Sequence, residues 1–216
     1  MWGPELTEVL LGFDARERWR DFSDDWNASR RRLYLLREDI EKPLSTDTTV
    51  WPSVFGEGLP DSEQLRALAH PSWRGPNGSL WDDLDVMRRC LAGRSPDLAF
   101  DIIAVSWLRE SRGKVGEVGP YAERMNPPTR DDDWTLLGFD VSDAGVSGLM
   151  NCGFEEQERQ DCVKRWGPHL NRHHLFAAIE DARQFRAFSD KRVAEHAPFF
   201  ILALWLVERV TVMAPE

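Results

Sequence analysis

A cysteine followed by several histidines is the first feature of this chain that could do chemistry. Cys152 lies in a loop-forming segment after an apolar run, and His169, His173 and His174 follow it. Cysteine hydrolases and transferases assemble a nucleophile and a base from such residues. The spacing matches no known cysteine signature, and a free cysteine is often a small buried residue. A cysteine-dependent hydrolase or transferase using Cys152 with His169 or His173 is therefore kept as the alternative function.

The same region contains the ligand types of a zinc site. Cys152, Cys162, His169 and His173 would supply four ligands suited to tetrahedral zinc. Nine residues separate the two cysteines, whereas a zinc knuckle keeps about two to four between them. Pro168 also prevents one helix from aligning the ligands. We expect no metal here, and no cofactor, because phosphate-loop and dinucleotide signatures are missing from the sequence.

Carboxylates gather just before this cysteine. Asp131, Asp132 and Asp133 are consecutive, and Asp140 and Asp143 follow shortly after them. Consecutive carboxylates diverge, and the run lacks the central glycine and terminal glutamate of a calcium loop. Such a run is typical of a solvated rim, which beside an apolar strand could face a basic protein surface. These five aspartates are the main candidate binding residues.

Tryptophan is frequent, with ten in 216 residues. Most of these rings must lie in the core. Trp51 and Trp73 stand in expected loops close to prolines, where a large ring with one polar edge can anchor a partner. We add both to the candidate binding residues, although a loop aromatic more often packs on its own domain.

The charge balance narrows the choice of partners. The chain has 37 acidic and 27 basic residues and a formal charge of −10. Its field repels nucleic acid and anionic lipid and attracts basic proteins. A protein partner is expected, with no nucleic acid and no membrane. The N-terminus lacks the basic region of a secretory signal, and the three cysteines suit a reducing compartment, so we expect a cytoplasmic location.

Helical patterns are found in four parts of the chain. An N-terminal helical section is expected over about residues 1–43, made of a short helix over Leu6–Phe13 and a longer one that Asp14 caps. A short helix is expected over Asp61–His70. Ser79 and Asp82 resemble a capping box for a helix that reaches Leu91. The last pattern has its apolar residues at Leu175, Ala178, Ile179, Ala182 and Phe185.

Three segments are predicted to be strands. Phe100–Leu108 is apolar on both parities, which is typical of a buried strand, although Ser95 and Pro96 also fit a helix start. Trp134–Val141 and Phe199–Val207 are the other two. The sequence thus predicts one α+β domain over residues 1–216. Its small antiparallel sheet of three to four strands is packed with several helices, the N-terminal section among them.

Three segments carry a resemblance to a known group of proteins. They are LLGFDVSDAGVSGLMNCGF at residues 136–154, HLNRHHLF at 169–176 and HAPFF at 196–200. In these segments the chain resembles uncharacterised bacterial proteins that are associated with polymorphic toxin systems as presumed immunity proteins. The resemblance implies a cytosolic binder, not an enzyme, that blocks a cognate toxin. The leading prediction is therefore an acidic protein-binding protein, an immunity protein whose toxin presents a basic surface.

Overall fold

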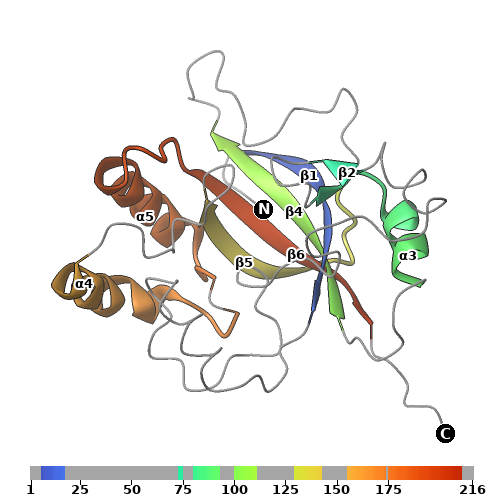
Figure 1. Ribbon diagram of the computed structural model, residues 1–216. Coiled ribbons are helices and arrows are strands. Elements are labelled where there is room, and N and C mark those ends of the chain that lie inside the picture. The colour runs from blue at the N-terminus through green and yellow to red at the C-terminus, as the bar shows by residue number, and fades with distance from the viewer. Residues whose placement is uncertain are drawn as a thin grey trace, which may run out of the picture.

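A sheet of six strands forms the centre of the part of the chain that the computed structural model describes, which is residues 6–17, 73–74, 80–92, 100–110, 129–142, 155–173 and 175–210. The strands are β1 (Leu6–Glu17), β2 (Trp73–Arg74), β3 (Leu80–Trp81), β4 (Phe100–Glu110), β5 (Thr135–Ser142) and β6 (Phe200–Val210). Their spatial order is β2-β3-β1-β4-β6-β5, and every neighbouring pair is antiparallel (Figure 1). The helices are α3 (Leu84–Ala92), α4 (Glu156–Trp166) and α5 (Ile179–Arg192), with a 3₁₀ turn η1 at Gly167–His169. The α+β class is confirmed, and the sheet has more strands than the three to four predicted.

The three predicted strands are confirmed as β4, β5 and β6. Phe100–Leu108 falls within β4, which pairs with β1 on one side and β6 on the other. Each residue from Asp101 to Leu108 is buried, so both faces of this strand are covered. Burial on both faces explains the continuous apolar run, because alternation appears only where one face meets water.

The N-terminal helix expected over Leu6–Phe13 is wrong, since these residues begin strand β1. β1 pairs with β4 from Leu6 opposite Glu110 to Glu17 opposite Phe100, with a register shift between Leu10 and Gly12. The shift puts Leu6, Leu10 and Phe13 on one face and Val9 on the other. An alternating pattern interrupted in this way resembles helical spacing. The longer helix that Asp14 was expected to cap is also wrong at its start, because Asp14 is a buried residue of β1 opposite Ile103 and the strand continues to Glu17. Residues 1–5 and 18–43 of the expected N-terminal section, and the helix over 61–70, lie outside the described residues.

The helix expected after Ser79 exists but begins later. Residues Leu80 and Trp81 form β3, and the carboxylate of Asp83 caps α3 by accepting hydrogen bonds from the backbone N–H of Asp85 (2.9 Å) and of Val86 (3.0 Å). Trp73, expected in a loop, is a residue of β2 and pairs with Trp81. The last helical pattern is α5, which starts after Leu175 and Ala178. Helix α4 was not predicted, because among its residues whose side chains are described only Cys162 and Trp166 are buried.

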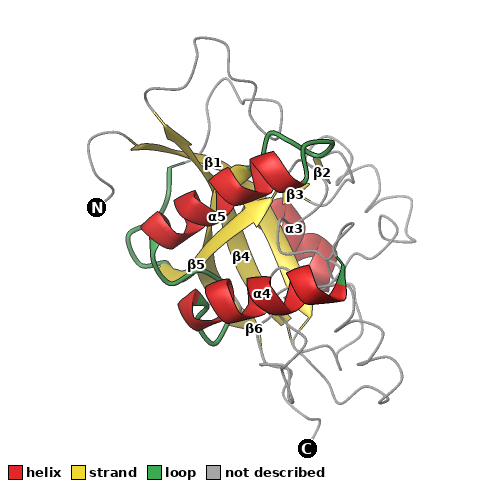
Figure 2. Ribbon diagram, turned by 90° about the vertical axis from the view of Figure 1, so that its left-hand side faces the viewer, coloured by secondary structure: helices red, strands yellow, loops and turns green. Residues whose placement is uncertain are grey.

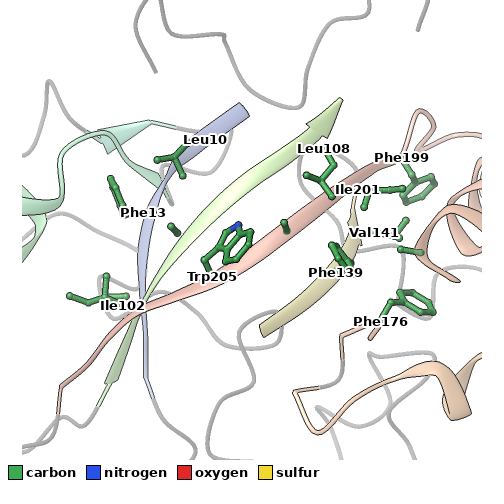
Figure 3. Close-up of a cluster of buried hydrophobic side chains, with 14 of the residues drawn as sticks. Leu10, Phe13, Ile102, Leu108, Phe139, Val141, Phe176, Phe199, Ile201 and Trp205 are labelled. Atoms are coloured by element: carbon green, nitrogen blue, oxygen red, sulfur yellow. The ribbon is translucent and has the colours of Figure 1, made fainter. Parts of the chain in front are cut away.

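All three helices contribute to one cluster of buried side chains on a single face of the sheet, here called the helix-covered face. It includes Leu10, Phe13, Ile102, Phe139, Val141, Ile201 and Trp205 (Figure 3). Helix α3 packs near the end of β6, and α4 and α5 pack at the other end of the strands (Figures 1 and 2). The opposite face is also apolar and buried, through Leu11, Ile103, Val105, Trp107, Leu202 and Leu204. Among the described helices, none is long and apolar enough to cross a membrane.

Candidate protein-binding surface

The segment that precedes β5 crosses the helix-covered face and is anchored there by two side chains. The guanidinium of Arg130 lies 4.4 Å from the centroid of the Trp205 ring on β6, and its Nε is 3.7 Å from Oε2 of Glu8 on β1. The Trp134 ring meets the edge of Phe13, with their centroids 5.7 Å apart. A cation over an indole face, combined with a partly buried ion pair, holds a segment more firmly than an exposed pair does. The acidic turn between these anchors is thus fixed to the sheet at both ends.

Asp131 holds the turn together from within. Its carboxylate Oδ1 accepts a hydrogen bond from the backbone N–H of Asp133 at 3.1 Å. Its carbonyl accepts from the backbone N–H of Trp134 at 3.3 Å and from Nη1 of Arg130 at 3.1 Å. Aspartate commonly stabilises turns by bonding to the backbone two residues on. Asp131 therefore has a structural role in addition to its charge.

The next two carboxylates face solvent. The side chain of Asp132 is 99% exposed, and its contact with Nη2 of Arg130 is 3.4 Å long. Asp133 is exposed as well. Their backbone is held by Asp131, so the two charges are presented from an ordered turn. Binding to such an ordered turn would cost less conformational entropy than binding to a flexible loop.

The structure separates Asp140 from the other predicted binding residues. Its side chain is 6% exposed, and it lies on β5 opposite Leu202, which belongs to the buried cluster on the far face of the sheet. Its Oδ1 accepts a hydrogen bond from the N–H of Val141 at 2.9 Å. Asp140 therefore cannot belong to an acidic surface. Asp143 and Trp51 lie outside the described residues, as does Cys152.

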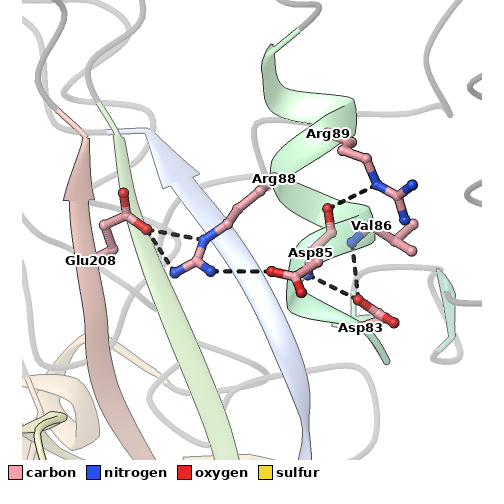
Figure 4. A network of polar contacts seen from close by, with 6 residues as sticks. All are labelled: Asp83, Asp85, Val86, Arg88, Arg89 and Glu208. Atoms are coloured by element: carbon pink, nitrogen blue, oxygen red, sulfur yellow. Dashed lines mark hydrogen bonds and ion pairs between the residues drawn. The ribbon is translucent and has the colours of Figure 1, made fainter.

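A second set of exposed carboxylates, which the sequence reasoning missed, lies at the start of α3 (Figure 4). Asp83 caps the helix, and Asp85 in its first turn is 3.3 Å from Arg88. Arg88 also bonds to Oε2 of Glu208 on β6 through Nε at 3.1 Å and Nη2 at 3.0 Å. The capping pattern of the sequence could have located these acids, because acidic residues favour the first turn of a helix.

The acidic turn and the start of α3 both border Phe13. Phe13 contacts Trp134, the residue that follows Asp133, and is the register partner of Trp81, two residues before Asp83. Two segments about fifty residues apart in the sequence, each with exposed carboxylates, are therefore both connected to Phe13. Exposed carboxylates on both segments favour a cationic partner, and Arg88 and Arg130 offset part of their charge.

The two histidines of the alternative hypothesis are engaged in other contacts. Nδ1 of His169 is 3.0 Å from Oδ2 of Asp181, and the imidazole packs against Trp166 with their ring centroids 6.3 Å apart. His173 is 7% exposed, and its Nε2 accepts a hydrogen bond from Nε of Arg172 at 3.2 Å. Among the described residues, no group of three or more His, Cys, Asp or Glu is arranged to hold a metal ion.

Cys162, one of the two cysteines considered as zinc ligands, is buried on α4. Burial raises the pKa of its thiol, and the nearby carboxylate of Glu158 adds to that effect. A thiol with a raised pKa is a weak nucleophile and a weak metal ligand at neutral pH. This environment is typical of a structural cysteine.

The first prediction concerns the reactivity of this thiol. We expect iodoacetamide to label Cys162 at least about tenfold more slowly in the folded protein than in urea, because only the exposed thiolate reacts. Labelling of the peptide that contains Cys162, followed by mass spectrometry over time, measures the ratio. Equal rates in the two states would contradict the structural role.

The described residues of the three segments that carry the resemblance lie in β5 or beside it. Phe139 and Phe176 exchange backbone hydrogen bonds of 3.0 and 2.9 Å, so the described residues 170–173 and 175–176 cover one edge of β5; we call these residues the edge clamp. On its other side β5 pairs with β6, where Ser142 lies opposite Phe200. The N–H of Phe199 donates to Oδ1 of Asp190 on α5 at 2.8 Å. The described residues of the three segments are therefore neighbours in the fold.

Asn171 fixes the edge clamp to the sheet. Its Nδ2 donates to the carbonyl of Leu137 at 2.7 Å, and its Oδ1 accepts from the backbone N–H of His173 at 2.8 Å and of Leu175 at 3.4 Å. One amide side chain thus supplies hydrogen-bond partners to a strand carbonyl and to two loop N–H groups. Buried backbone groups require such partners. The edge is closed to pairing with another chain along this stretch.

Helices α4 and α5 are joined by one ion pair that makes stability depend on pH. Nη2 and Nε of Arg192 donate to the carboxylate of Glu158 at 2.7 and 3.1 Å, and the N–H of Glu155 donates to it at 3.2 Å. The Arg192 hydrogen bonds are the main reason that the pKa of Glu158 lies below its usual range, and the Glu155 N–H adds to them. The contribution of Glu158 to stability is therefore present above its unfolded-state pKa and is lost as the pH falls through the folded-state value.

We expect Glu158→Gln to flatten the acid side of the stability curve. Between about pH 5 and about pH 3 the wild type should lose stability more steeply than the variant, and high salt should shrink the difference because the pair is partly exposed. Urea unfolding at several pH values measures both slopes. Arg192→Ala should flatten the same window, and identical slopes in all three proteins would contradict the assignment.

Comparison of the chain with protein-family models, with curated proteins and with solved structures gave no significant match. The likeness to proteins of toxin systems therefore stays a prediction.

Proposed function

We propose that this protein binds a basic protein partner and inhibits it, as an immunity protein does with its toxin. The observation that carries the proposal is the turn Asp131–Asp133, in which exposed carboxylates project from a backbone anchored to β1 and β6. The formal charge of −10 gives the whole molecule the same sign. Charge of one sign speeds the encounter with a partner of the opposite sign.

The anchoring of the turn bears on how tightly a partner could be held. A preordered surface costs less conformational entropy on binding, and this gain appears mainly as slower dissociation. Asp132 and Asp133 supply charge-assisted hydrogen-bond acceptors for lysine or arginine. Inhibition would follow if the partner's basic groups at this surface were those that its own substrate needs.

The experiment that tests the proposal is co-purification of the full chain from its native host, followed by mass spectrometry at low and moderate salt. A stoichiometric protein of basic charge is the expected result. Once that partner is in hand, its activity is measured with and without this chain. Absence of any stoichiometric protein at both salt concentrations would refute binding, whereas binding without loss of activity would refute inhibition.

The second arm of the test changes the turn. We expect Asp132→Asn with Asp133→Asn to slow association about threefold to thirtyfold at low salt, with little change at high salt where the charges are screened. Asp131 is left in place because it bonds to the turn backbone. Stopped-flow or surface-binding kinetics against the purified partner measure the association rates.

A matched control removes two charges elsewhere. Asp161 on α4 and Glu195 after α5 are exposed and lie at the end of the strands where α4 and α5 pack. Asp161→Asn with Glu195→Gln changes the net charge by the same amount, so it should reproduce only the effect of overall charge. If the two double variants associate equally slowly, the turn is not the binding surface.

A further inference from the structure

We draw no further inference here: the strongest candidate, the side-chain cluster of Ser106, Glu8 and Arg130 on the helix-covered face of the sheet, carries none because nothing in the structure shows what would bind beside the buried hydroxyl of Ser106.

Discussion

Replacing Gly138 with alanine is expected to lower the free energy of unfolding by about 2 to 5 kcal/mol, because backbone strain and overpacking add at this position. Gly138 has φ of +147°, a conformation that residues with a Cβ rarely adopt. An added Cβ would lie 2.7 Å from Cβ of Leu175, 2.8 Å from Nδ2 of Asn171 and 2.9 Å from the carbonyl of Phe176. The methyl group would therefore push the edge clamp away from β5. Urea unfolding followed by tryptophan fluorescence measures the loss.

Gly167→Ala is the matched control for this substitution. Gly167 is helical, with φ of −52°, and the nearest atom to an added Cβ is Cγ1 of Val163 at 4.0 Å. Alanine fits there and restricts the unfolded chain, so the stability should stay the same or rise by up to about 1 kcal/mol. If Gly138→Ala and Gly167→Ala had equal stability, the edge clamp would not restrict the space at residue 138.

The second large effect is expected for Trp166→Ala, at about 3 to 5 kcal/mol, the usual cost of removing a buried large aromatic side chain. The Trp166 ring is the main anchor of α4. It meets Phe185 at 5.4 Å and Phe176 at 6.4 Å edge to face, and Arg165 lies 4.5 Å from its centroid. Because these contacts join α4, the edge clamp and α5, the truncation should loosen all three. Thermal or urea unfolding measures the cost.

Two companion variants separate anchoring from general damage. Trp166→Phe should cost less, because it keeps an aromatic ring and, among the described residues, no acceptor pairs with the buried indole N–H that it removes. Lys164→Ala, exposed on the same helix, should change stability by less than about 0.5 kcal/mol. Trp166→Ala should also speed the alkylation of Cys162, one turn away on α4. Slow labelling in that variant would show that α4 has a different anchor.

Gly138 and Trp166 both lie outside the set of residues that anchors the acidic turn. Gly138 and Trp166 belong to the β5 edge and the α4–α5 layer, whereas the acidic turn rests on Trp205, Glu8 and Phe13. Association with a basic partner should therefore survive a conservative change such as Trp166→Phe as long as the protein is folded. A loss of binding in that folded variant would place the binding surface near α4 instead of the turn.

The sequence predicted the elements whose burial is evident from their amino-acid composition. The continuous apolar run at residues 100–108 predicts a buried strand. In the structure both faces of β4 contact apolar layers, so the strand has no polar alternation. The exposure of Asp132 and Asp133 was also predictable, since consecutive carboxylates cannot all be buried or paired. In contrast, the apolar spacing in β1 predicts a helix, because the register shift before Gly12 breaks the strand alternation and that shift arises in the pairing with β4.

By itself, then, the sequence determined the α+β class, three of the six strands, the net negative charge and a solvated acidic turn, all of which follow from local composition and period. The tertiary structure alone decided which carboxylates share a surface. It buried Asp140 against the far face of the sheet, brought Asp83 and Asp85 to the same region as the turn, and fixed Asp131 as a turn brace. The physical reason is that register and strand order, which long-range pairing sets, determine the face on which each side chain lies.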